Sequence, residues 1–92
     1  MIVSYRDKDT QALAEGRRVA RFRAIERPAR RKLYQLHLAR SVADLGIPPG
    51  NRLEKLAGDR AGQWSIRIDD RWRVCFQWRA DAAHGVEIVD YH

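Results

Sequence analysis

Residues 64–79 read Trp64-Ser65-Ile66-Arg67-Ile68-Asp69-Asp70-Arg71-Trp72-Arg73-Val74-Cys75-Phe76-Gln77-Trp78-Arg79, and this stretch decides the fold. Apolar and polar side chains alternate through both halves, a period of two that is typical of strands with one face on a hydrophobic core. Asp69-Asp70 interrupts the alternation and predicts a tight connection. We therefore expect two antiparallel strands that are apolar on one face and rich in arginine on the other.

Further strands are expected at both ends of the chain. Residues 80–85 predict a looser loop after the second strand, and Val86–Val89 then continues the strand pattern to the last three residues. At the other end, Ile2–Tyr5 predicts a short strand. The sheet should therefore have three or four strands.

Between these strands, the first half of the chain has the period of helices. Asp9 or Thr10 is expected to cap a brief helix that continues to Ala14 and stops at Gly16. Pro28 suits the first turn of a longer main helix. That helix has a stripe at 3.6-residue spacing, made of Ala29, Leu33, Leu36, either Ala39 or Arg40, and Ala43.

The segment after the main helix predicts where helical structure ends. Ser41 and Asp44 resemble a capping box and indicate a short helix over residues 42–45, while Gly46 and Pro48-Pro49-Gly50 end helical structure. Residues 1–92 thus form one α+β domain. We expect two or three N-terminal helices on one face of a three- to four-stranded antiparallel sheet.

The composition favours an acidic partner. Eighteen Lys and Arg residues against 12 Asp and Glu residues give a formal charge of +6. Most of these cations are arginines, whose planar guanidinium suits phosphates and bases, so the bias points to nucleic acid. The chain lacks the ~18 apolar residues of a membrane helix and a signal-peptide pattern, so we expect a cytoplasmic protein with no membrane contact. Cys75, the one cysteine, excludes an internal disulfide and predicts a buried structural thiol.

The last three residues, Asp90-Tyr91-His92, follow directly from the last predicted strand. A carboxylate, a phenol and an imidazole meet the proton-transfer needs of RNA cleavage by the substrate's own 2′-hydroxyl, which requires a base and an acid. Taken alone, such a trio at a chain end is more often accidental. No metal is expected, because His37 and His84 have no ligand spacing relative to Asp90 and His92.

Arginines gather at two places. Arg67, Arg71 and Arg73 are expected on the polar face of the sheet, where they could cradle a phosphate backbone or simply be solvated. A second group precedes and enters the main helix, and it too could grip phosphates or face water: Arg17, Arg18, Arg21, Arg23, Arg27, Arg30, Arg31 and Lys32. Ser41 and Ser65 have no neighbouring His and Asp pattern of a hydrolase triad.

Several of these segments together resemble a known family, the HigB branch of the RelE/ParE toxin superfamily. The resemblance is close over residues 45–92 and looser over residues 1–44. It rests on five runs: Pro48–Leu56, Gly58–Arg60, Gln63–Ile68, Trp72-Arg73 and Val86–His92.

The resemblance implies a RelE-like fold and a ribosome-dependent endonuclease of messenger RNA that needs no cofactor. It also implies a HigA-like helix-turn-helix antitoxin as partner, with operator DNA contacted only through that antitoxin. Carried over by position, Arg73 would stabilise the scissile phosphate, and Asp90, Tyr91 and His92 would transfer protons and position the nucleotide. The residues expected to bind RNA are Lys55, Arg60, Arg67 and Arg71.

The chain departs from the family pattern at two positions. Some members have a histidine where this chain has Glu54 and a lysine where it has Ala57. Glu54 is therefore either a catalytic base or a surface partner of Arg52, Lys55 or Arg60, and Lys55 is a candidate to supply the missing positive charge.

Two other functions stay open from the sequence. A ParE-like toxin has this fold but inhibits DNA gyrase without an acid–base set, and the terminal trio argues against it. A nucleic-acid-binding co-repressor would need only the net charge of +6, yet the sequence has no evident helix-turn-helix.

Overall fold

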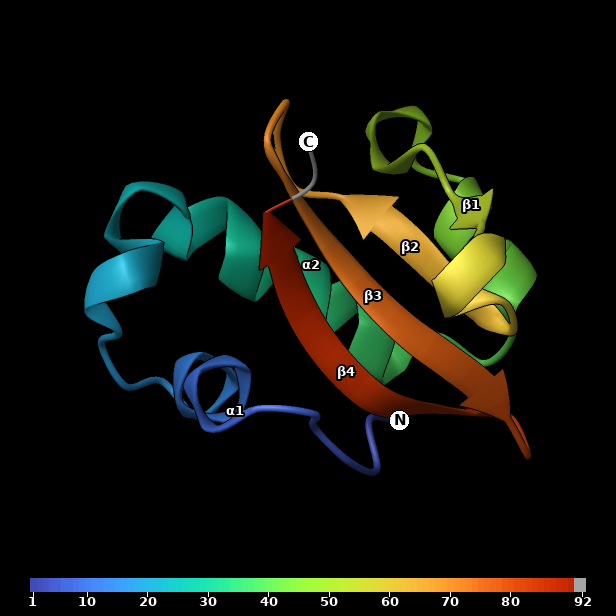
Figure 1. Cartoon of the computed structure of the whole chain (residues 1–92), viewed down its shortest axis with the longest axis horizontal. Helices are drawn as coiled ribbons and strands as arrows, with labels where there is room; N and C mark the ends of the chain where they lie inside the picture. Colours follow the sequence, from blue (N-terminus) through green and yellow to red (C-terminus); the bar gives the residue numbers. More distant parts are fainter. Residues whose placement is uncertain (91–92) are drawn as a thin grey trace.

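The computed structural model describes residues 1–90, and the predicted α+β class is confirmed (Figure 1). A four-stranded antiparallel sheet has the strand order of the sequence. Its strands are β1 (Glu54–Lys55), β2 (Gln63–Arg67), β3 (Trp72–Arg79) and β4 (Ala82–Asp90). The decisive stretch forms β2 and β3, as its alternation predicts.

The lengths of the two connections between the long strands are the reverse of the prediction: β2 and β3 have the longer connection, and β3 and β4 have the tight turn. The predicted tight turn at Asp69-Asp70 is part of a longer connection, residues 68–71, in which Asp69 Oδ1 accepts hydrogen bonds from the backbone of Arg71 and Trp72. The tight turn is instead Ala80-Asp81, where both residues have positive φ (49° and 59°). Two positive φ values give the twist that antiparallel strands need across a two-residue turn.

The predicted loop at residues 80–85 was therefore wrong over most of its length, because β4 already begins at Ala82. Within β4, Gly85 has a φ of +60° and lies at a bulge where the β3–β4 register shifts, so the regular pairing of the two strands is interrupted there. Its N–H donates to Ser4 Oγ (2.8 Å). The N-terminal segment follows β4 through two isolated parallel bridges, Ile2 to Ala83 and Tyr5 to Val86, and does not form the separate strand we expected.

The N-terminal helix begins earlier than predicted. Helix α1 covers Lys8–Ala14, and its cap is Asp7, whose carboxylate accepts from the Thr10 N–H (3.0 Å); neither Asp9 nor Thr10 caps it. Thr10 is instead buried, and its Oγ1 accepts from the N–H of Ile88 on β4 (3.0 Å). This buried hydrogen bond joins α1 to the sheet.

The main helix, α2 (Glu26–Leu38), follows a 3₁₀ helix, η1 (Ala20–Ile25), and has Pro28 in its first turn as expected. Four members of the predicted stripe are buried, while Ala43 is exposed because α2 ends at Leu38. The capping box at Ser41 and Asp44 is present and begins η2 (Val42–Gly46). Two more 3₁₀ turns follow, η3 (Pro49–Asn51) and η4 (Gly58–Arg60).

The core lies between the helices and one face of the sheet. In Figure 1, α2 passes behind the sheet, so the opposite face of β2 and β3 is not covered by it. No helix among residues 1–90 is long and apolar enough to cross a membrane. The core side chains from the helices include Leu13, Phe22, Ile25, Ala29, Leu33, Leu36 and Leu45, and those from the sheet include Ile66, Val74, Phe76, Ala83, Val86 and Ile88.

Candidate active site

Arg73 is a nearly buried cation on the face of the sheet away from α2. It lies near the start of β3, and only 12% of its side chain is exposed. Its Nε donates to Ser65 Oγ on β2 (2.8 Å), and its Nη2 donates to the backbone carbonyl of Arg52 (2.7 Å). Arg52 has a left-handed backbone (φ 44°) as the chain leaves η3. Acceptors from two separate segments therefore fix the plane of the Arg73 guanidinium.

Glu54 lies beside this guanidinium. It pairs with Ser65 across β1 and β2, so both side chains are on the same face of the sheet. Glu54 Oε2 is 4.0 Å from Arg73 Nη2, and 58% of the Glu54 side chain is exposed. The ion pair that the structure describes for Glu54 is thus with Arg73, rather than with Arg52, Lys55 or Arg60. A carboxylate next to a buried cation and open to solvent can reach a substrate.

Arg60 borders the same face from η4. Its Nη1 donates to Gln63 Oε1 (3.1 Å) and to Glu87 Oε1 (3.0 Å). Glu87 is opposite Cys75 in the β3–β4 ladder, which puts it on the Arg73 face. Arg60 therefore reaches across the face from η4 to β4.

Arg67 and Arg71 lie at the end of the sheet where residues 68–71 connect β2 to β3. Arg67 is opposite Arg73 in the β2–β3 ladder and forms an ion pair with Asp70. Arg71 donates two hydrogen bonds to Asp90 Oδ2, from Nε (2.9 Å) and Nη2 (2.7 Å). These hydrogen bonds raise the pKa of Arg71 above its ordinary value.

Lys55 lies apart from this group. It is opposite Trp64 in the β1–β2 ladder, and its ammonium is 5.8 Å from the centre of the Trp64 ring. Since neighbouring residues of a strand point to opposite faces, Lys55 and Glu54 project to different sides of the sheet. The structure therefore does not bring Lys55 next to Arg73.

Asp90 is the last described residue of the predicted terminal trio. Asp90 pairs with Trp72, and its neighbour Val89 pairs with Arg73. Asp90 and Arg73 therefore project to opposite faces at this end of the sheet. The described role of Asp90 is to hold Arg71. Tyr91 and His92 lie outside the described residues, and they follow directly from this anchored end of β4 in the sequence.

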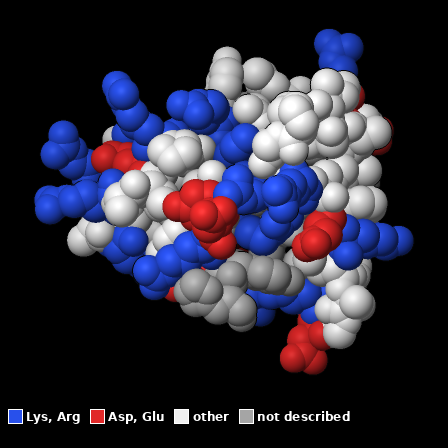
Figure 2. All heavy atoms as spheres, turned by 90° about the horizontal axis from the view of Figure 1, so that it is seen from above, with Lys and Arg blue, Asp and Glu red and all other residues white. Residues whose placement is uncertain are grey.

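Figure 2 looks onto the end of the molecule where β1, the 68–71 connection and the end of β4 meet. Lys and Arg side chains gather at the centre of this view, with acidic side chains among them. Among residues 1–90, no group of three or more His, Cys, Asp or Glu side chains is arranged to hold a metal ion. The cations that the register and hydrogen bonds place on the Arg73 face are the guanidinium groups of Arg60, Arg67 and Arg73.

Ser65 is a site residue that the sequence analysis missed. Ser65 is fully buried, and its hydroxyl accepts the hydrogen bond that orients Arg73. The sequence pattern of a hydrolase triad considers a serine only as a nucleophile, so it did not point to this role. Its signal in the sequence was its place in the alternation of β2, on the same side as Arg67 and directly before the apolar Ile66.

Cys75 is expected to be unreactive in the folded chain. It is fully buried opposite Ser65, and burial raises the pKa of its thiol above the usual value. The thiolate, which is the nucleophilic form, is therefore scarce at neutral pH. Titration with a thiol reagent at pH 7 should label Cys75 only after denaturant is added. Rapid labelling of the native chain would contradict this placement.

Comparison with known proteins identifies the family. Residues 5–92 match the family model of the HigB-like toxin, described as the RelE-like toxin of the type II toxin-antitoxin system HigB. The chain belongs to this family. It is therefore a RelE-like toxin of a type II toxin-antitoxin system, and an antitoxin is its partner.

Individual relatives agree with this assignment. Toxin HigB-1 of Vibrio cholerae serotype O1 is 39% identical to this HigB-like toxin over 80 residues, which cover 85% of this chain and 84% of the relative. Endoribonuclease HigB of Proteus vulgaris is 42% identical over 41 residues, 45% of each chain. The solved YoeB-YefM complex from Staphylococcus aureus has a similar fold, with a TM-score of 0.56 at 16% identity over 100% of this chain and 98% of the other.

Proposed function

We propose that this HigB-like toxin is an endoribonuclease that cuts messenger RNA on the ribosome, through attack of the substrate's own 2′-hydroxyl on the adjacent phosphate. The observation that carries the proposal is the fixed, nearly buried Arg73 on the face of the sheet away from α2, with Glu54 at 4.0 Å. The name of the Proteus vulgaris relative supports the same activity.

In this proposal, Arg73 stabilises the charge that develops on the scissile phosphate. A donor that is held in place before the reaction needs no reorganisation in the transition state, which makes it more effective than a mobile cation. Arg67 and Arg60 border Arg73 on the same face and bind neighbouring phosphates. Because guanidinium groups supply the positive charge, the proposed reaction needs no metal ion.

The proton transfers are assigned to Glu54 and to the terminal residues. Cleavage requires a base that takes the proton of the 2′-hydroxyl and an acid that protonates the leaving 5′-oxygen. Glu54, which is exposed beside Arg73, is suited to the first role. Tyr91 and His92 are proposed for the second role and for positioning the nucleotide, while Asp90 anchors the strand that carries them by holding Arg71.

The remaining proposed partners follow from the same activity. Lys55 and Arg71 bind RNA outside the Arg73 face, the ribosome presents the message, and a HigA-like antitoxin neutralises the toxin and contacts operator DNA.

The reaction is tested by incubating the toxin with a translating extract and with free RNA. Fragments that end in a 2′,3′-cyclic phosphate, formed only during translation, are expected; uncut message in the translating extract would exclude the proposal.

Ser65→Ala is expected to lower the rate of cleavage without changing substrate binding. A hydrogen bond to a charged group is worth about 1.5–3 kcal/mol, so loss of the Ser65 acceptor should lower kcat by ~10-fold or more while KM stays constant. Ser65→Thr keeps the hydroxyl and should restore most of the rate. A change confined to KM, or equal losses in both variants, would mean that Ser65 does not position Arg73.

A further inference from the structure

The excess of positive charge lies in the helical half of the chain, not in the sheet. Residues 1–40 contain 11 of the 18 Lys and Arg residues and four of the 12 Asp and Glu residues, which leaves +7 there and −1 over residues 41–92. The proposed cleavage site draws on cations of the second half. The helical layer therefore has a charge that the cleavage site does not account for.

One side of α2 has two exposed cations, followed toward the C-terminal end of the helix by two exposed apolar residues. Arg27, Arg31, Tyr34 and Leu38 are spaced by four, three and four residues, so they lie on one side of the helix. All four are exposed, Tyr34 by 64% and Leu38 by 59%. We name these four residues the α2 stripe. It faces away from the sheet, because the opposite side of α2 packs on the core.

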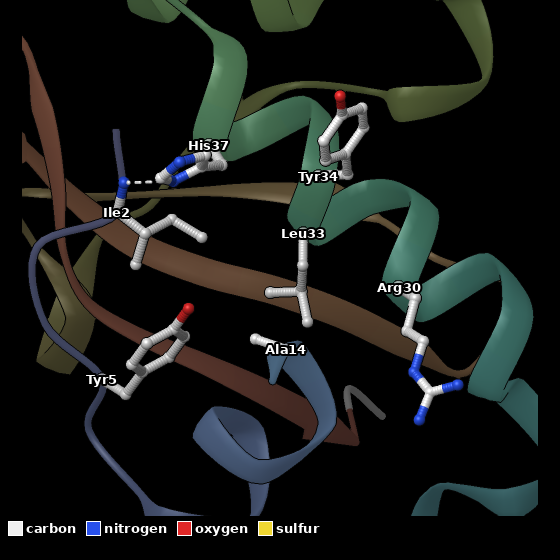
Figure 3. A pocket seen from close by; sticks show the side chains of 7 residues that line it. All are labelled: Ile2, Tyr5, Ala14, Arg30, Leu33, Tyr34 and His37. Carbon is white, nitrogen blue, oxygen red and sulfur yellow. Dashed lines mark hydrogen bonds between the residues drawn. The ribbon is translucent and has the colours of Figure 1, made fainter. Parts of the chain in front are cut away.

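A cavity of about 420 Å³ adjoins the α2 stripe at Tyr34. Figure 3 shows it between the N-terminal segment, the end of α1 and α2, with apolar side chains pointing toward it. Most of its lining is apolar, from Ile2, Tyr5, Ala14, Leu33 and Tyr34. A small apolar side chain from outside would be buried there.

Hydrogen bonds fix two sides of this cavity. At one end, Arg30 of α2 donates to the backbone carbonyls of Leu13 (3.2 Å) and Arg17 (2.8 Å), which ties the end of α1 to α2. At the other end, His37 Nδ1 accepts from the N–H of Ile2 (3.2 Å), as Figure 3 shows. The cavity is thus formed in the isolated chain, and a ligand need not open it.

We infer that the α2 stripe and the adjoining cavity bind the antitoxin, through a segment that places apolar side chains in the cavity and over Tyr34 and Leu38 and carboxylates against Arg27 and Arg31. An RNA backbone would match the two arginines but would leave Leu38 and the apolar cavity without a partner. An acidic amphipathic peptide matches both halves of the stripe, since burial of apolar anchors within a charged rim is typical of protein interfaces.

This inference depends on the family assignment and not on the proposed cleavage reaction. Arg73 lies on the face of the sheet away from α2, so the antitoxin segment on the α2 stripe and the RNA at Arg73 use different sides of the toxin. Antitoxin binding and toxicity should therefore be separable by mutation.

The decisive variant is Tyr34→Glu, and Ile47→Glu is its matched control. Both positions are exposed apolar residues, at 64% and 77%, and Ile47 lies outside the stripe and the cavity. Each chain is titrated calorimetrically with the full-length antitoxin of its own toxin-antitoxin pair. Tyr34→Glu should weaken binding by at least ~30-fold, as expected for a buried aromatic anchor, whereas Ile47→Glu should change it by less than about threefold.

A second pair of variants tests the charged half of the stripe without changing the cavity. Arg31→Glu should weaken antitoxin binding by ~10-fold or more at low salt and less at high salt, and Arg79→Glu, an equal change of charge at the far end of β3, should not. In cells, Tyr34→Glu should still arrest growth, and the antitoxin should no longer relieve the arrest.

Three results would overturn the inference. The first is wild-type antitoxin affinity in both Tyr34→Glu and Arg31→Glu. The second is equal weakening by the stripe variants and their controls. The third is loss of growth arrest with antitoxin binding intact, which would assign the stripe to a nucleic acid. Because binding is measured without cleavage, failure of the proposed nuclease activity would leave this test unaffected.

Discussion

Arg73→Ala is expected to lower the rate of message cleavage by at least a hundredfold and to abolish growth arrest. Its guanidinium is held by Ser65 and by the carbonyl of Arg52, so it is in place before the phosphate arrives. Removal of one such preorganised donor costs about 3 kcal/mol of transition-state stabilisation. The measurement is the single-turnover rate of cleavage in a translating extract, with antitoxin binding as the test of folding.

Arg79→Ala is the control for Arg73→Ala. Arg79 is at the other end of the same strand and is exposed, so its loss removes an equal charge from β3 away from the site. It should cleave at nearly the wild-type rate. Wild-type cleavage by Arg73→Ala, or equal losses in the two variants, would show that Arg73 does not stabilise the reacting phosphate.

His92→Gln is expected to lower the cleavage rate by about 10²–10⁴-fold, the usual contribution of a general acid or base. Glutamine keeps hydrogen-bonding capacity but cannot exchange a proton near neutral pH, so RNA binding should be largely retained. His84→Gln makes the same change on β4, far from its end, where the imidazole Nε2 lies 3.2 Å from the carbonyl oxygen of Arg79.

The pH profile of the same variants adds an independent readout. A rate limited by an imidazole should change near neutral pH in the wild type and in His84→Gln, and this dependence should disappear in His92→Gln. A wild-type rate and pH profile in His92→Gln would remove the terminal histidine from the mechanism.

The long strands and the main helix could be predicted because each buries one face of a regular element. The alternation of β2 and β3 and the 3.6-residue stripe of α2 record that burial directly in the sequence. Strand β1 could not be predicted, because two residues are too few to show a period. Its place depends on pairing with β2, which is a tertiary contact.

The turns were misjudged for a different reason. Residues 80–85 predicted a loose loop, yet Gly85 lies at a bulge inside β4, while the tight turn uses Ala80 and Asp81 at positive φ. Their conformation is imposed by the pairing of β3 with β4 on either side, and intrinsic preference would not have chosen alanine there.

The sequence could predict which residues belong to the candidate site, but not how their side chains are arranged in space. Resemblance to the family pointed to Arg73 and Glu54, and the structure places them side by side. The resemblance could not show that Glu54, rather than its neighbour Lys55, projects to the Arg73 face, nor that Asp90 holds Arg71. Those facts depend on register, and a shift of one residue would reverse each of them.

The central claim is tested most directly by mapping the 5′ ends of messages in cells that produce the toxin without its antitoxin. The account predicts new ends within translated codons soon after induction, and their absence in cells that produce Arg73→Ala at the same level. Growth arrest without new ends inside codons, accompanied by a DNA-damage response, would contradict it and would favour a toxin that acts on DNA gyrase.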